Sequence, residues 1–379
     1  MSDDLAILGQ DPRLGGGSLA QTRAFVDAAA RLGRTATLYH LAYHGLTQRP
    51  EESLGIETVA IRPLVHGLDG LNQCVAAHRV AAVASARSLW VVSTVASHGY
   101  AAARSERAYA CWVGTSLEDE WRGRRTSLPV SRRAALAVST STLRRLERRV
   151  LRGAAAVYAT SPASRTAVAE AAGLPEDGVS ILPIPVDTER FTPLPDDEWE
   201  RRLEQPVVIF VGRASDPRKN IGLLLAAFAR LRERVPGARL RLVGEPPSTR
   251  LLAGVGDAVE VVGAVHAIEP HLREAALFVL PSRQEGFGIV AAEALAAGVP
   301  VVATPSGGPE ELLRASGGGR VLSGFEPDEL ADAMAELLLD VDALRALRAQ
   351  GRAYVAREHS PERFRSLLGA AMTRLDAHE

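Results

Sequence analysis

The feature that most constrains the fold of this chain is a regular alternation between two kinds of segment. Short runs rich in valine, isoleucine and leucine alternate with longer amphipathic stretches along almost the whole sequence. This alternation is typical of βαβ units and of a mostly parallel sheet. At 379 residues the chain is too long for one ordinary hydrophobic core. The sequence therefore predicts an α/β protein with two doubly wound, Rossmann-like lobes that face each other across a cleft.

The expected elements form two series, separated by a proline-rich, acidic run that indicates a linker. We expect a first lobe over 1–187, a linker over 188–206 and a second lobe over 207–360, with a C-terminal helix over 361–379 that packs back on the first lobe. First-lobe strands are expected at 5–9, 35–41, 56–61, 89–95, 108–113, 154–160 and 179–183, and helices at 18–32, 72–88, 131–151 and 162–172. Second-lobe strands are expected at 207–212, 238–243, 258–262, 277–281 and 300–304, and helices at 220–234, 268–275, 288–298, 327–337 and 341–357.

Composition and charge exclude several classes of protein. A formal net charge of −1 gives no general reason to bind nucleic acid. Two cysteines are too few for a disulfide framework or a cysteine-rich metal site. The N-terminus lacks the apolar run of a signal peptide, and no window approaches the length of an uninterrupted apolar membrane span. We therefore expect a cytoplasmic protein that binds no nucleic acid.

The richest motif runs from Pro281 to Glu293 and reads PSRQEGFGIVAAE. An apolar strand leads into a glycine-rich turn, and an alanine-rich helix follows. Backbone amides at the start of such a helix, together with the helix dipole, favour an anion. Glu285 in the turn is suited to sugar hydroxyls, and Glu293 further along the helix is suited to a ribose diol. From these residues alone, a solvated or capping carboxylate at Glu293 is an equal alternative.

A second cluster follows the expected strand 207–212. Arg213 and Lys219 flank the loop between that strand and the next helix, where two cations can face a diphosphate. Lys219 is the only lysine among 44 lysines and arginines, which indicates a site that needs a compact ammonium group. Two solvated loop cations are the alternative, and Arg218 is expected to be a solvated neighbour.

These motifs resemble those of retaining GT-B glycosyltransferases, and of glycosyltransferase family 4 in particular. Residues 285–293 are similar to the family's two glutamates separated by seven residues, and the pattern continues through 294–304 and Gly307-Gly308. The resemblance is strong over 205–325 and weak elsewhere. It implies retaining transfer of a hexose-type sugar from a UDP- or GDP-linked donor to an acceptor hydroxyl.

The resemblance also implies a role for each residue of the motifs. Glu285 would contact the transferred sugar and Glu293 the ribose, while Arg213 and Lys219 would neutralise the departing diphosphate. Val265 would lie at the base pocket. The other donor-binding residues are expected to contribute their backbone: Gly16 and Gly17 at the start of the first-lobe helix, and Gly286, Phe287, Gly288, Ile289 and Val290.

The sequence departs from the family pattern at one catalytic position. Family members often carry a histidine just after a first-lobe strand, but here Gly114, Thr115 and Ser116 follow the strand that ends at Val113. His98 is the nearby substitute, and we include it among the catalytic residues. A structural or solvated role for His98 is the alternative.

We expect no essential metal or other cofactor, because no set of histidine, cysteine and carboxylate residues has metal-ligand spacing. The acidic run 118–120 is interpreted as solvated. Residues 122–152 hold ten arginines and one glutamate. They could form a basic face that contacts the inner face of the membrane or a phosphorylated acceptor, or they could form a solvated helix. The acceptor stays open among a saccharide, a lipid-linked molecule and a small molecule.

Two other functions fit the same pattern. A GT-B-fold nucleotide-sugar epimerase or hydrolase would have the same lobes but no acceptor. An inactive partner subunit would still bind a nucleotide, but it would be free to lose the charged residues of both motifs, and they are intact.

Overall fold

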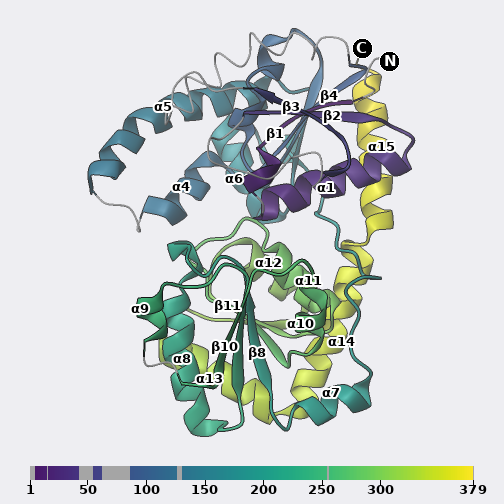
Figure 1. Cartoon of the computed structure of the whole chain (residues 1–379). Coiled ribbons are helices and arrows are strands. Elements are labelled where there is room, and N and C mark those ends of the chain that lie inside the picture. The colour runs from purple at the N-terminus through teal and green to yellow at the C-terminus, as the bar shows by residue number, and fades with distance from the viewer. Residues whose placement is uncertain are drawn as a thin grey trace. The chain divides into compact units, whose positions relative to one another are not determined.

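The computed structural model of this chain forms two compact units (Figure 1). The first combines Met1–Pro185 with Pro361–Glu379, and the second is Val186–Ser360. The segment 188–206, expected to be a linker, belongs to the second unit and contains helix α7 (Asp196–Arg202). The structure describes residues 5–14, 16–41, 54–61, 86–125, 130–253 and 256–378.

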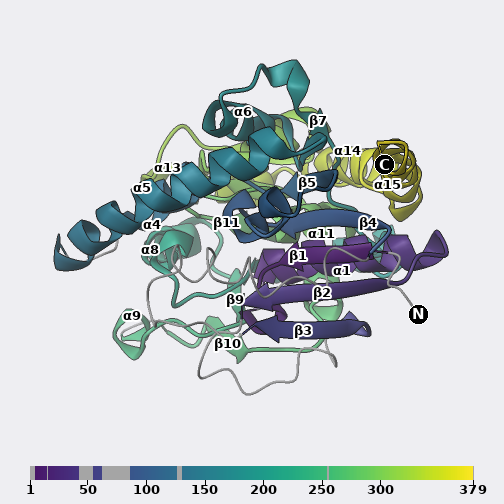
Figure 2. The ribbon, with the colours of Figure 1, turned by 90° about the horizontal axis from the view of Figure 1, so that it is seen from above.

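The centre of the first unit is a parallel sheet of seven described strands, in the order β3-β2-β1-β4-β5-β6-β7. Figure 2 shows β1, β2 and β3 side by side in this sheet. Strands β4 and β5 are buried at every residue, which is the pattern of a parallel sheet covered on both faces. The strands are β1 (Leu5–Gly9), β2 (Ala36–Leu41), β3 (Glu57–Ile61), β4 (Ser88–Ser93), β5 (Tyr109–Val113), β6 (Ala156–Ala159) and β7 (Ser180–Ile181). The helices are α1 (Gly16–Arg31), α4 (Leu117–Arg125), α5 (Val130–Gly153), α6 (Pro162–Ala172) and α15 (Pro361–Asp376).

The second unit repeats this plan with a parallel sheet of six described strands, in the order β10-β9-β8-β11-β12-β13. Its strands are β8 (Val207–Val211), β9 (Arg239–Val243), β10 (Val259–Gly263), β11 (Leu277–Leu280), β12 (Val301–Ala303) and β13 (Gly319–Val321). Its helices after α7 are α8 (Ile221–Arg234), α9 (Thr249–Leu252), α10 (Glu269–Arg273), α11 (Ile289–Ala296), α12 (Gly308–Ser316), α13 (Pro327–Leu339) and α14 (Val341–Glu358). Among the helices of the described residues, none is both long and apolar enough to span a membrane.

In both sheets, the order in which the chain adds strands reverses at a central strand, β1 or β8. The chain first runs from β1 to β3, or from β8 to β10, toward one edge, and it then returns to the other side of the central strand with β4 or β11. Ligands of open parallel sheets bind beyond the carboxyl ends of the strands at this topological switch point. The loops that follow β1, β4, β8 and β11 are therefore the places where a ligand site is expected.

Helix α15 joins the end of the chain to the core of the first unit. The ring of Phe364 lies 5.0 Å from that of Trp112 in β5, and Trp112 lies 6.1 Å from Phe25 in α1. Near the end of the helix, Asp376 accepts a hydrogen bond of 2.5 Å from Arg34. The first unit is therefore built from both ends of the chain.

The predicted α/β fold with two doubly wound lobes is confirmed, and each expected strand end lies within two residues of the observed one. The expected helix 72–88 falls mainly on residues 72–85, which lie outside the described residues. Helices α4, α7, α9 and α12 and strand β13 were not predicted. Strand β13 is only three residues long and begins with a glycine because a Cβ on Gly319 would lie 1.9 Å from the Val301 carbonyl oxygen. Such a glycine-led strand gives no apolar pattern to detect.

The segment 188–206 is ordered by contacts that proline and acidic composition do not reveal. Trp199 is 1% exposed, and the guanidinium of Arg348 from α14 lies 5.0 Å from its ring centre. Arg352, one helical turn further, donates to the carbonyl oxygens of Thr188 at 2.9 Å and Phe191 at 2.5 Å. Two arginines of α14 thus hold this segment against the rest of the second unit.

Candidate functional site

The loop after β8 and the loop after β9 touch through glycine backbones. Gly212 and Gly244 both have positive φ angles, 151° and 113°. A Cβ on Gly244 would lie 2.3 Å from the Gly212 carbonyl oxygen, so no larger residue fits there. This close approach shapes the start of the loop that carries Arg213 and Lys219.

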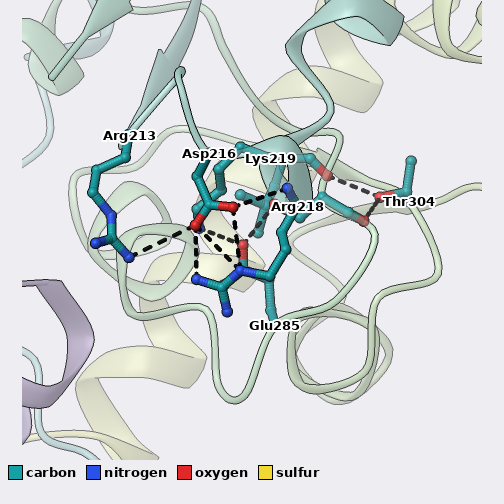
Figure 3. A network of polar contacts seen from close by, with 8 residues as sticks. Arg213, Asp216, Arg218, Lys219, Glu285 and Thr304 are labelled. Carbon is teal, nitrogen blue, oxygen red and sulfur yellow. Dashed lines mark hydrogen bonds and ion pairs between the residues drawn. The ribbon is translucent and has the colours of Figure 1, made fainter. Parts of the chain in front are cut away.

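Lys219 and Glu285 meet at the β8–β11 switch point (Figure 3). The Nζ atom of Lys219 donates to Oε1 of Glu285 at 2.5 Å, and the Ser282 hydroxyl donates to the same oxygen at 2.6 Å. The side chains of Lys219 and Glu285 are only 18% and 14% exposed. The two residues are 66 positions apart in sequence, and the strand order of the sheet brings them together.

The turn that carries Glu285 is held by hydrogen bonds to residues that follow β12. The Thr304 hydroxyl, just after β12, donates to the Ser282 carbonyl oxygen at 2.6 Å, and both residues are fully buried. The Glu285 amide donates to the Ser306 carbonyl oxygen at 2.8 Å. Glu285 is therefore held in place at its backbone and at its carboxylate.

Arg213 and Arg218 both approach Asp216, but they differ in exposure. Arg218 makes a two-pronged contact with the carboxylate, at 3.2 Å from Nε and 2.7 Å from Nη2 to Oδ2, whereas Nη2 of Arg213 is 3.7 Å away (Figure 3). Burial opposes ionisation of Asp216, but the bonds from Arg218 outweigh it and lower its pKa. The expectation that Arg218 is solvated is wrong, since its side chain is 16% exposed and Arg213 is 52% exposed. Arg213 is the cation that remains accessible to a ligand.

The glycine-rich turn before α11 packs against the turn before α12. Gly288 caps α11 with a φ angle of 77°, and a Cβ there would lie 2.6 Å from Cγ of Pro309. A Cβ on Gly308 would lie 2.0 Å from the carbonyl oxygen of Gly286. Between them, the Phe287 side chain is buried, with its ring 5.1 Å from that of His359.

The first amides of α11 have no carbonyl oxygen of a preceding helical turn to which they could donate. The amides of Ala291 and Ala292 donate to the Gly288 carbonyl oxygen. Ile289 and Val290 precede these first bonds, at the positive end of the helix dipole. This helix start lies beside the turn of Glu285, which makes the site suited to an anion.

Glu293 lies in the second turn of α11 in a poorly solvated setting. Burial raises the pKa of its carboxyl group to about 7, Arg190 acts in the opposite direction, and Glu269 adds to the rise. Arg190 and Glu269 were missed from the sequence, because they lie in the segment 188–206 and at the start of α10, far from Glu293 in sequence. Only their positions in the folded unit associate them with it.

Val265 lies two residues beyond the end of β10, in the loop before α10. The Gly244 amide donates to the Gly263 carbonyl oxygen at 2.8 Å, which ties the ends of β9 and β10 together. Because the carboxyl ends of parallel strands share one edge of a sheet, Val265 lies on the same edge as Arg213 and Glu285.

The remaining predicted residues lie at the switch point of the first unit. Gly16, with a φ angle of 68°, and Gly17 open α1 after β1. His98 follows β4 in the short helix Ala96–Gly99, with Nδ1 2.7 Å from the hydroxyl oxygen of the buried Ser93. The structure thus pairs Lys219 with Glu285 in the second unit, with Arg213 in the same loop as Lys219, and holds His98 in the first.

The second unit matches a known family. Residues 205–340 match the model of the family described as "Glycosyl transferases group 1". The second-unit site residues predicted from the sequence, from Arg213 to Glu293, lie within the matched segment, whereas Gly16, Gly17 and His98 lie outside it.

Two curated relatives resemble parts of the chain. The GDP-mannose-dependent alpha-(1-6)-phosphatidylinositol monomannoside mannosyltransferase of Mycobacterium tuberculosis is 39% identical over 240 residues, which are 58% of this chain and 61% of that protein. The D-inositol 3-phosphate glycosyltransferase of Geodermatophilus obscurus is 36% identical over 214 residues, which are 51% and 46%. The chain therefore spans between about half and three fifths of the length of these relatives.

Solved structures resemble the whole chain in fold. Sucrose-phosphate synthase from Thermosynechococcus elongatus superimposes with a TM-score of 0.79 at 20% identity and covers 99% of both chains. Anabaena Alr3699/HepE, solved with UDP and glucose, gives a TM-score of 0.75 at 19% identity and covers 98% of this chain and 99% of its own. The chain has the GT-B architecture of these proteins.

The acidic run and the arginine-rich segment meet in the first unit. Arg122 lies 3.0 Å from Asp119, and Arg144 of α5 lies 3.3 Å from Glu118. Residues 126–129 and the side chains of 123–139 are outside the described residues. Within the described part of the chain, no group of three histidine, cysteine, aspartate or glutamate residues is arranged to hold a metal ion.

Proposed function

We propose that this chain is a retaining glycosyltransferase that moves a hexose from a nucleotide-diphosphate sugar to an acceptor hydroxyl. The observation that carries the proposal is the Lys219–Glu285 pair at the β8–β11 switch point, with the start of α11 beside it. One group is suited to a phosphate and the other to sugar hydroxyls, and they lie 2.5 Å apart. A sugar diphosphate offers a phosphate and sugar hydroxyls on neighbouring parts of one molecule.

The proposed chemistry places charge where the second unit can stabilise it. The bond between the anomeric carbon and the diphosphate oxygen breaks, so positive charge develops on the sugar and negative charge on the diphosphate. Arg213, Lys219 and the amides of Ile289 and Val290 stabilise the leaving diphosphate. The acceptor oxygen then bonds to the anomeric carbon on the same face, and its proton passes to a phosphate oxygen. Protein cations supply the charge in this scheme, so no metal is required.

The donor and the acceptor are proposed from the relatives. GDP-mannose is the first donor to test, because the mycobacterial relative is named for it, and UDP-sugars are the second class. Both relatives are named for acceptors that contain an inositol phosphate group. We propose an acceptor hydroxyl of that type, with the protein acting in the cytoplasm and the arginine-rich segment 122–152 near an anionic membrane surface.

A thermal-shift panel and a transfer assay test this proposal. GDP, UDP, ADP and their sugars are compared, since a ligand at 100 times its dissociation constant adds about 2.7 kcal/mol of stability. We expect GDP-mannose to stabilise the protein, and NMR of the product to show the anomeric configuration of the donor. An inverted product would contradict the retaining mechanism. Release of free or epimerised sugar without any acceptor would favour the epimerase or hydrolase alternative.

A further inference from the structure

Asp216 lies in the loop after β8, between Arg213 and Lys219 in sequence. It has a clear local role, because its Oδ1 atom accepts the Arg218 amide at 2.9 Å and caps the short turn Pro217–Lys219. Its carbonyl oxygen accepts the Lys219 amide at 2.9 Å. Aspartate is among the residues that best cap such a turn. The same residue also places a negative charge beside two cations that are proposed to bind a diphosphate.

Two arginines approach the carboxylate of Asp216, but at different distances. Arg218 donates from Nε to Oδ1 at 3.3 Å and from Nη2 to Oδ2 at 2.7 Å. The Nη2 atom of Arg213 lies 3.7 Å from the same Oδ2 atom, which is beyond hydrogen-bond distance (Figure 3). Oδ2 of Asp216 is therefore an acceptor that both arginines can reach and that Arg218 occupies.

The two arginines also differ in how firmly they are held. The side chains of Arg218 and Asp216 are 16% and 17% exposed, whereas that of Arg213 is 52% exposed. An exposed ion pair contributes little stability, so Arg213 can turn away from Asp216 at small cost. Among the described residues, Arg213 is the other cation within 4 Å of this carboxylate. Arg213 would therefore become the partner of Asp216 if Arg218 were lost.

We propose that Arg218 is a positioning residue of the diphosphate site: by occupying the carboxylate of Asp216, it leaves Arg213 available to the diphosphate. This inference rests on the proposed function, because it assumes that Arg213 binds the diphosphate. A guanidinium group bonds equally well to a carboxylate and to a phosphate, so Asp216 and the ligand compete for Arg213. Arg218 removes the competitor while the cap that Asp216 provides is kept.

The test measures GDP affinity by calorimetry in variants of this pair. Arg218→Gln should weaken GDP binding by about five- to tenfold, because Arg213 turns to Asp216. Asp216→Asn keeps an oxygen for the cap but removes the competing charge, so GDP affinity should be equal or higher. Adding Asp216→Asn to Arg218→Gln should restore most of the affinity, and Arg218→Lys should retain part of it.

Two further measurements separate positioning from folding and from a general change of charge. In an Arg213→Gln background, Arg218→Gln should cause little additional loss of GDP affinity. Arg13→Gln is the matched control, because Arg13 bonds to Asp11 at 2.6 Å in the same kind of turn and its side chain is 15% exposed. This control should leave GDP affinity unchanged, and thermal unfolding of every variant should be measured alongside.

Three results would overturn the proposal. They are a loss in Asp216→Asn as large as in Arg218→Gln, no recovery in the double variant, and an undiminished effect of Arg218→Gln when Arg213 is already replaced. Normal GDP affinity and transfer in Arg213→Gln would also overturn it, but would leave the proposed function standing on Lys219. If the wild type bound neither GDP nor UDP, both the proposal and the proposed function would be contradicted.

Discussion

The loop after β1 and the loop after β8 contain the same turn but differ in what surrounds it. Both read Asp-Pro-Arg, at residues 11–13 and 216–218. In each, the arginine amide bonds to its aspartate, at 3.0 and 2.9 Å, and Nη2 bonds to Oδ2, at 2.6 and 2.7 Å. The shared arginine therefore neutralises its own turn and contributes little free charge to a ligand.

The residues outside this turn distinguish the two units. In the second unit, Arg213 and Lys219 flank the turn, and Lys219 contacts Glu285 from the neighbouring strand. In the first unit, Gly16 and Gly17 open α1 after the turn, and across the switch point the Thr94 hydroxyl donates to Oε1 of Gln10 at 3.2 Å. This difference supports the proposal that the second unit binds a charged diphosphate and the first unit an uncharged hydroxyl.

The largest expected effect is on Arg213 and Lys219, the cations that flank the turn in the second unit. Lys219→Ala should lower the rate of transfer by roughly 100-fold or more, because one charge-stabilising donor is lost. Arg213→Ala should act in the same direction but less strongly, since its side chain is 52% exposed. Steady-state rates of the purified variants, with Arg234→Ala as a surface control, check this. Near-normal turnover in Lys219→Ala would contradict a catalytic role for the cations that distinguish the loop after β8 from the loop after β1.

The first unit has its own buried carboxylate, and we expect it to affect stability. Glu147 of α5 is 2% exposed and accepts the Leu117 amide at the start of α4 at 2.9 Å. Burial raises its pKa to about 7, so the folded state holds a proton that the unfolded chain releases near its ordinary value of 4.5. Its contribution is therefore fully present below that value and is lost as pH rises toward 7, by about 3 kcal/mol. Unfolding curves should show this slope in the wild type and a flatter profile in Glu147→Gln; equal slopes would contradict it.

Substitutions of Glu293 and Glu285 in the second unit should have different effects on GDP affinity and on sugar transfer. Glu293→Gln should weaken binding of bare GDP by about 1.5–3 kcal/mol, the usual value of a hydrogen bond to a charged group. Glu285→Gln should depress transfer but leave GDP affinity equal or higher, because it releases Lys219 from its partner. The GDP affinities of both variants, measured by calorimetry, test these two assignments. Normal GDP binding by both would make Glu293 a helix-face carboxylate, and weaker binding by Glu285→Gln would reverse the assignment.

A smaller effect is expected from exchanging one cation for another. Lys219→Arg should lower transfer by about tenfold, because the larger, planar guanidinium must fit where the ammonium group lies 2.5 Å from Glu285. The turnover number and the GDP affinity of this variant should be compared with those of Lys219→Ala. If Lys219→Arg keeps full activity, the single lysine of the chain is there by chance.

No effect is expected from removing divalent metal. Since protein cations supply the charge in the proposed mechanism, the transfer rate should be unchanged after treatment with excess EDTA. A rate that falls and is restored by magnesium or manganese would mean that the second unit lacks part of the charge it needs.

The outcome at each residue shows what the sequence could and could not predict. Apolar periodicity located almost every strand, because buried parallel strands are continuous apolar runs. Arg218 was assigned wrongly, since spacing alone does not reveal its pairing with Asp216. The Lys219–Glu285 contact and the position of Arg190 depend on strand order and on a turn after the unit boundary. These are properties of the folded unit, and no local pattern encodes them.

The central claim, that Lys219 lies at the diphosphate site, has one direct test. Because the chain has a single lysine, labelling with isotopically enriched lysine yields one side-chain signal, and that signal belongs to Lys219. We predict that adding GDP shifts the Lys219 signal in NMR spectra, with a titration curve that matches the calorimetric affinity, and that guanosine without phosphate leaves it in place. A signal that stays unchanged while GDP saturates the protein would contradict the account.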